Sequence, residues 1–176
     1  MLQQTLIIIK PDGVKGGFTD EIIRRYKVVG LKVVKRKDMR APLDIVEKHY
    51  PMDRDYLRSI GEKTIAAGQK VKSAEDQGRK VVTWLRKFIT SGPIVVLLLE
   101  GENAVEVARK VTGFTDPATA EKGTIRGDLG TDNILKANRE ERPVYNLLHA
   151  SGSPEEAKKE IGLWFGRGAE NISSSA

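Results

Sequence analysis

The sequence contains no cysteine among its 176 residues. This absence excludes a disulfide framework, catalysis by a thiol and a metal site built from cysteines. No apolar run is long enough to cross a membrane, and the N-terminus does not resemble a signal peptide, because residues 7–9 (III) reach only strand length. We therefore expect one domain in the cytoplasm, long enough to bury a full hydrophobic core without disulfide bonds or a structural metal.

A phosphate-binding P-loop is also missing. Residues 61–64 read GEKT, but the upstream glycine of the motif is absent and another residue separates the glycine from the lysine. The neighbouring residues 68–78 are polar and contain two glycines, at their two ends. This composition favours a surface extension over a nucleotide-binding loop.

Positive charge is in excess. The chain has 30 Lys and Arg against 24 Asp and Glu, a formal net charge of +6 and a pI near 9.5. A basic surface can steer nucleotides or bind nucleic acid nonspecifically. Scattered basic residues also simply solvate helices, and we favour this interpretation for residues 35–37 (KRK) and 158–159 (KK).

Residues 145–153 (YNLLHASGS) place a histidine at the end of a short apolar run. Ser153 is a suitable N-cap for a helix, Pro154 suits its first position, and Glu156 at the third position completes a capping box. The pattern predicts that His149 lies at the end of a strand beside a helix N-terminus, where anions are favoured.

The following helix brings a carboxylate toward this histidine. Ala157, Ile161 and Trp164 recur at helical spacing and are expected to face the core, with Glu160 at the border of that stripe. Such a carboxylate can hold one ring nitrogen of His149 and leave the other free as a nucleophile. The alternative is an ordinary strand-end histidine and a solvated helix charge.

Several segments resemble the nucleoside diphosphate kinase family, in the family's order across nearly the whole chain. The stretch 146–149 (NLLH) resembles the family's N-x-x-H active-site segment. The other matches are residues 5–12 (TLIIIKPD), 91–93 (SGP), 100–105 (EGENAV), 123–128 (GTIRGD) and 160–165 (EIGLWF). Each motif alone is weak, but together they are specific.

The resemblance implies an α+β fold, a ferredoxin-like sandwich with a four-stranded antiparallel sheet covered by helices. Residues 1–165 would form the single domain, with a helical insertion at about 58–80, a loop insertion at about 130–143 and a mobile tail over 166–176. Family members assemble as hexamers or tetramers, so a homo-oligomer is expected.

The local patterns predict the elements of this fold. Strands are expected over 6–9, 31–39 and 94–99, and mostly helix over 42–90. Thr19 is expected to cap a helix whose buried face carries Ile22, Ile23, Tyr26 and Val29, and Gly30 to end it. A further helix is expected over 104–112, and a long irregular loop over 115–138.

The resemblance also assigns residues to a nucleotide site. Lys10 and Asn146 would bind the sugar, with Lys10 also reaching the phosphates. The phosphates would further contact Tyr50, Arg109, Thr115 and Arg126. Val81 stands where the family has a base-stacking phenylalanine, and Leu85 would line the same wall. Trp84 is an alternative platform or a core partner of Phe88. Gly152 replaces an aspartate, which puts that side chain's local hydrogen bond in doubt.

The implied reaction is transfer of the terminal phosphate from a nucleoside triphosphate, ATP included, to a nucleoside diphosphate through a phosphohistidine on His149. Glu160 would orient the ring and Lys10 would assist, with Mg²⁺ carried by the nucleotide rather than by a protein site. The alternative is a catalytically weak nucleotide- or nucleic-acid-binding protein on the same scaffold. No membrane partner is expected.

Overall fold

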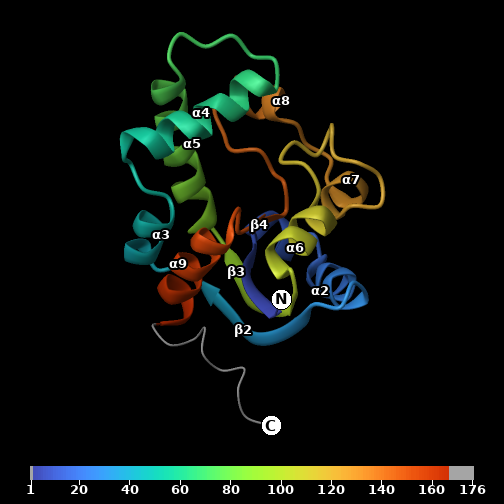
Figure 1. Ribbon diagram of the computed structural model, residues 1–176. Helices are drawn as coiled ribbons and strands as arrows, with labels where there is room; N and C mark the ends of the chain where they lie inside the picture. Colours follow the sequence, from blue (N-terminus) through green and yellow to red (C-terminus); the bar gives the residue numbers. More distant parts are fainter. Residues whose placement is uncertain (1, 167–176) are drawn as a thin grey trace.

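The computed structural model describes residues 2–166 as helices packed on both faces of one sheet (Figure 1). The four strands are β1 Leu2–Ile9, β2 Lys32–Arg40, β3 Pro93–Glu102 and β4 Leu148–Ala150. The longer helices are α2 Thr19–Val28, α3 Leu43–His49, α4 Arg54–Ala66, α5 Ala74–Ile89, α6 Ala104–Thr112 and α9 Pro154–Phe165. Three short helices are α1 Pro11–Lys15, α7 Ile125–Leu129 and α8 Ile134–Arg139.

The sheet has the strand order β2-β3-β1-β4, and all neighbouring strands are antiparallel. The central strand β1 pairs Leu6 with Leu98 of β3 and Ile8 with His149 of β4. This arrangement confirms the predicted four-stranded antiparallel sheet of a ferredoxin-like α+β fold.

The apolar runs of β1 and β3 are continuous because helices cover both faces of the sheet. Leu6 and Ile8 face α3, α4, α5 and α9, whereas Ile7 and Ile9 face α2, α6 and α7. All four side chains are fully buried. Two cores therefore hold the strands, and both extend to the edge where β1 ends at Lys10.

Two local predictions were wrong, and residues 11–15 form a helix, α1, for which no prediction was made. The N-cap of α2 is Phe18 rather than Thr19, because the chain enters the helix one residue earlier. Val29 is 45% exposed instead of facing the core, since α2 ends at Val28 and the chain turns at Gly30, which has a φ of +87°.

The two predicted insertions both contain helices. The helical prediction for 58–80 holds for α4 and the start of α5. The irregular loop expected over 115–138, and the loop insertion at 130–143, are corrected by α7 and α8. Thr124 and Asn133 cap these helices by accepting backbone N–H bonds, a signal that the many polar residues of this region obscured.

No helix within the described residues is long and apolar enough to cross a membrane. The predicted mobile tail lies outside the described residues, except for Gly166, which follows α9.

Candidate functional site

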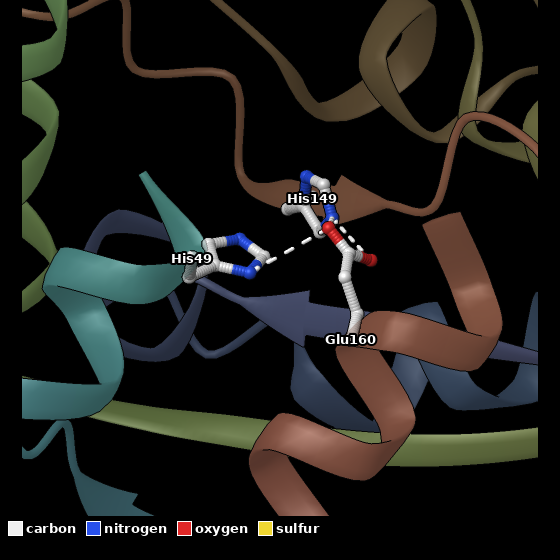
Figure 2. A group of neighbouring side chains, drawn as sticks. All are labelled: His49, His149 and Glu160. Atoms are coloured by element: carbon white, nitrogen blue, oxygen red, sulfur yellow. Dashed lines mark hydrogen bonds and ion pairs between the residues drawn. The ribbon is translucent and has the colours of Figure 1, made fainter. Parts of the chain in front are cut away.

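His149 on β4 and Glu160 on α9 form a hydrogen-bonded pair, as the sequence predicts (Figure 2). The ring Nε2 lies 2.8 Å from Oε1 and 3.0 Å from Oε2 of the carboxylate. Ser151 donates its hydroxyl to the same carboxylate at 2.6 Å. The other ring nitrogen of His149 points away from Glu160 (Figure 2). The pair therefore offers one occupied and one unoccupied imidazole nitrogen.

The start of α9 holds this geometry. The Ser153 hydroxyl accepts the N–H of Glu156 at 3.1 Å, and Pro154 occupies the first turn. The capping box is not reciprocal, because the Glu156 carboxylate instead accepts the N–H of Gly152 at 2.8 Å. A side chain at Gly152 would collide with that carboxylate. Glu156 thus takes the place where an aspartate at position 152 would stand.

Glu160 is buried because one face of α9 packs against the core. Ala157, Ile161 and Trp164 are buried as predicted, and Glu160 is only 6% exposed. Desolvation acts to raise the pKa of Glu160, but the charge and hydrogen bond of His149, with His49 and Ser151, lower it to about 2. Glu160 is therefore an acceptor above acidic pH, so in the neutral tautomer of His149 that this bond favours, Nε2 carries the proton and Nδ1 has the free lone pair.

A second histidine lies close to this carboxylate. His49 at the end of α3 places Nδ1 3.5 Å from Oε1 of Glu160, and the two imidazole rings meet edge to face at 4.7 Å. Trp164 donates its indole N–H to that Nδ1 at 3.2 Å, while Nε2 of His49 is buried with no hydrogen-bond partner in the structure. Burial, and then the neighbouring His149, lower the pKa of His49 to about 3. The resemblance assigns a phosphate contact to Tyr50 and no role to its neighbour His49.

Lys10 and Asn146 form a chain of hydrogen bonds at the end of β1. Lys10 donates to Oδ1 of Asn146 at 2.9 Å, and Asn146 donates to the Thr115 carbonyl at 2.9 Å. Burial is the main cause that lowers the pKa of Lys10 to about 8, and Arg126 lowers it further. Because Lys10 is only 5% exposed, its charge is held at a fixed place in the pocket.

Arg126 lies in the pocket wall, but its guanidinium donates to backbone carbonyls. The acceptors are Asn146 at 3.1 Å, Gly113 at 3.2 Å and Leu148 at 2.6 Å. Burial is the main cause that lowers the pKa of Arg126 to about 10. These bonds join the segment after α6 to the segment before His149, a positioning role that the motif did not indicate.

The pocket around these groups has a volume of about 700 Å³, within the range of small-molecule sites. All the residues predicted for the nucleotide site line it: Lys10, Tyr50, Val81, Leu85, Arg109, Thr115, Arg126, Asn146, His149 and Glu160. Burial raises the pKa of Tyr50, which keeps its hydroxyl protonated. The structure thus brings one anion-binding end and one apolar wall together.

The apolar wall settles which helix positions face the pocket. Val81 and Leu85 of α5 line it, but Trp84 does not. Phe88, the predicted partner of Trp84, packs against Tyr145 with ring centroids 5.1 Å apart. The i, i+4 pair Val81 and Leu85 forms the surface available to a flat ligand.

A divalent metal has one group of side-chain donors among residues 2–166. The ligand atoms of His49, His149 and Glu160 lie within 4.8 Å of one another. Two imidazoles suit transition metals, whereas Mg²⁺ prefers oxygen ligands. The described residues of this group therefore do not fit a protein-held Mg²⁺ site.

Comparisons with known proteins agree with this geometry. The family model described as nucleoside diphosphate kinase matches residues 3–60 and 63–169. A nucleoside diphosphate kinase of Pyrobaculum aerophilum is 44% identical over 174 residues, covering 93% of this chain and 95% of the relative. One of Pyrococcus furiosus is 40% identical, covering 93% and 83%.

Solved structures give the same result. The crystal structure of an NDP kinase from Pyrobaculum aerophilum superposes with a TM-score of 0.89 at 42% identity, covering 97% of this chain and 98% of the other. A nucleoside-diphosphate kinase from Borrelia burgdorferi, solved as a transition state mimic with vanadate and ADP, gives 0.77 at 34% identity, covering 93% and 87%. The chain therefore belongs to the nucleoside diphosphate kinase family, and it is an enzyme of nucleotide phosphate transfer.

Proposed function

We propose that this chain transfers the terminal phosphate of a nucleoside triphosphate to a nucleoside diphosphate in two half-reactions, through a phosphohistidine on His149. The observation that carries the proposal is the pairing of His149 with Glu160 at the wall of the pocket. The pairing holds the Nε2 proton and leaves Nδ1 as the nucleophile. A protein that only binds nucleotides has no need of this arrangement.

In the first half-reaction, the Nδ1 lone pair of His149 attacks the terminal phosphorus in line. The bond from that phosphorus to the bridging oxygen breaks, and the nucleoside diphosphate leaves with the electron pair. The imidazole becomes cationic, and Glu160 stabilises this cation across the Nε2 hydrogen bond. The second half-reaction reverses these steps with another nucleoside diphosphate as the acceptor.

The cationic end of the pocket offsets the charge of the phosphates. Lys10 and Arg109 supply positive charge, while Tyr50 and Thr115 supply hydroxyl groups. Arg126 uses three of its five N–H groups on backbone carbonyls. We propose that the remaining two face the phosphates.

The nucleoside would lie against the outer part of the pocket. Asn146 and Lys10 would hold the sugar, and the base would rest on Val81 and Leu85. Because these two side chains offer no hydrogen bonds to a base, we propose a broad tolerance for different bases. Mg²⁺ bound to the phosphate oxygens would supply further charge neutralisation. The vanadate and ADP bound by the Borrelia enzyme support a site for a nucleoside diphosphate and a transferring phosphate.

We further propose that the chain acts in the cytoplasm as a homo-oligomer, a hexamer or a tetramer. The competing function, nucleotide or nucleic-acid binding without turnover, is favoured by the net charge of +6 and by the departures from the family pattern at Val81 and Gly152. A salt titration separates the two functions, because nonspecific binding to nucleic acid weakens steeply as salt rises. Tight oligonucleotide binding at physiological salt would favour the binding protein.

A labelling experiment tests the reaction directly. The protein is incubated with Mg²⁺ and γ-labelled ATP, treated with acid or base, and in a parallel sample chased with GDP. We expect a label that is acid-labile and base-stable and that moves to GTP. A protein that binds ATP but acquires no label would contradict the proposed function.

A further inference from the structure

Lys63 on α4 faces the same pocket as Lys10, Arg109 and Arg126. It lies in the segment 58–80, which the sequence predicts to be an insertion relative to the family. Among residues 2–166, its ammonium makes no side-chain hydrogen bond and no ion pair. The pocket therefore contains, besides Lys10, Arg109 and Arg126, a cationic side chain on α4 that none of the family motifs includes.

The surroundings of Lys63 are rich in positive charge. Lys63 is exposed at the mouth of the pocket, and partial desolvation by the surrounding protein lowers the pKa of its ammonium. Glu156 acts to raise this pKa, and Arg126 and Arg109 lower it further. Lys63 in turn contributes to the lowered pKa of Lys10. Cations that repel one another within one pocket are stabilised together by a multiply charged anion.

Close packing between α4 and α5 fixes the position of α4, the helix that carries Lys63. A side chain at Gly61 would collide with the backbone of Ala74, and one at Gly78 would collide with the backbone of Leu57. The two glycines therefore allow the helices to touch at Leu57 and Gly61, in the turns of α4 that precede Lys63. The GEKT sequence is thus explained by helix packing plus one pocket-facing lysine.

The second predicted insertion braces the same turn. Asn138 of α8 donates to the Thr64 hydroxyl at 3.4 Å and to the Gln69 side chain at 3.0 Å. Thr64, next to Lys63, is buried. In Figure 1, α8 lies beside α4. Lys63 therefore lies on a helix that contacts both α5 and α8, whereas a lysine on a surface loop would lack this support.

We propose that Lys63 of α4 is an additional phosphate-binding residue of the nucleotide site. This inference rests on the proposed function for the identity of the ligand, a nucleoside di- or triphosphate. An ammonium that can move on a flexible stem suits a phosphate chain whose length changes during the reaction. The helix α4 would therefore contribute to binding as well as to the shape of the molecule.

The test is calorimetric binding of ADP and adenosine to the full chain and to three variants. Lys63→Met keeps the apolar stem and removes the charge, and Lys63→Arg restores the charge. Lys70→Met is the matched control, because Lys70 is an exposed lysine of the same segment that does not line the pocket. Thermal unfolding of each variant checks that the fold is kept.

We expect Lys63→Met to weaken ADP binding about tenfold, the effect of one charge-assisted hydrogen bond, and to leave adenosine binding unchanged. Lys63→Arg should recover most of the loss, and Lys70→Met should bind like the original chain. A purely structural role would weaken ADP and adenosine alike. ADP binding by Lys63→Met equal to that of Lys70→Met would overturn the inference.

Binding of ADP needs no turnover, so the two proposals fail separately. If the original chain acquires no label from ATP while Lys63→Met still weakens ADP binding, the phosphohistidine proposal fails and the role of Lys63 stands. If the original chain becomes labelled and Lys63→Met binds ADP normally, the role of Lys63 fails alone.

Discussion

The two ends of the pocket are built in different ways. The inner end is the part of the pocket that contains His149, Glu160, Lys10 and Asn146, and hydrogen bonds at defined distances fix these side chains. The outer end is the apolar wall, where the packing of α5 against the core positions Val81 and Leu85. Hydrogen-bonded polar groups define a geometry to fractions of an ångström, whereas an apolar wall defines a shape. We infer that the chemistry resides in the inner end and the tolerance for different bases in the outer end.

The largest effect should come from His149→Ala, which removes the proposed nucleophile from the inner end. We expect exchange of phosphate between ATP and GDP to fall by at least about 10³-fold. The fold should persist, because the partly exposed ring contributes little to either core. Initial rates and circular dichroism measure both properties. Exchange at even a tenth of the original rate would mean that another residue carries the phosphate.

Glu160→Gln tests the role of charge at the inner end, because it keeps the shape of this end and removes one charge. We expect phosphorylation of His149 to slow by about 10- to 100-fold, the effect of losing a partner that orients a histidine. Affinity for ADP should change little. Rapid-quench kinetics measures the first quantity and calorimetry the second. Unchanged kinetics would reduce Glu160 to a structural carboxylate.

His49 makes the stability of the inner end depend on pH. Its pKa is lowered from 6.5 to about 3, mainly by burial, so the folded chain keeps it neutral while the unfolded chain protonates it. This contribution to stability is complete above pH 6.5 and is lost as the pH falls toward 3. Between pH 6 and 4.5, we expect it to lower the free energy of unfolding by about 1.4 kcal/mol per pH unit.

Urea denaturation of the original chain and of His49→Asn over this range isolates the contribution. Asparagine retains an acceptor for the Trp164 indole and does not titrate. The variant should show a shallower dependence on pH. Equal slopes would show that His49 is protonated in the folded chain. The pH range excludes most of the titration of Glu160, whose pKa is lowered from 4.5 to about 2.

The sequence predicts the inner end better than the outer end, for a physical reason. The strand end places His149 and helical spacing places Glu160, so two local rules are sufficient to pair them. Arg126 was predicted to bind phosphates, but a sequence motif does not show which backbone carbonyls a guanidinium will meet. Lys63 was missed because no local pattern shows which side of α4 packs against a distant pocket.

The same reasoning applies to the fold. Apolar runs locate β1 and β3 because both faces of each strand are buried, and the capping residues locate α9. The helices α7 and α8 were missed because each is short and begins at a polar cap within a polar region. Helical periodicity needs more turns than these helices have.

The smallest effect should come from the apolar wall, where Leu85→Ala and Trp84→Ala form a matched pair on α5. Leu85 lines the pocket and Trp84 does not, although they are neighbours in sequence. We expect Leu85→Ala to raise the KM for ATP and GTP by a similar factor of about three to five, because it removes apolar contact without a base-specific bond. Trp84→Ala should leave both KM values unchanged. A larger effect of Trp84→Ala would make the tryptophan the base platform, and unequal effects on ATP and GTP would mean that the outer end discriminates between bases.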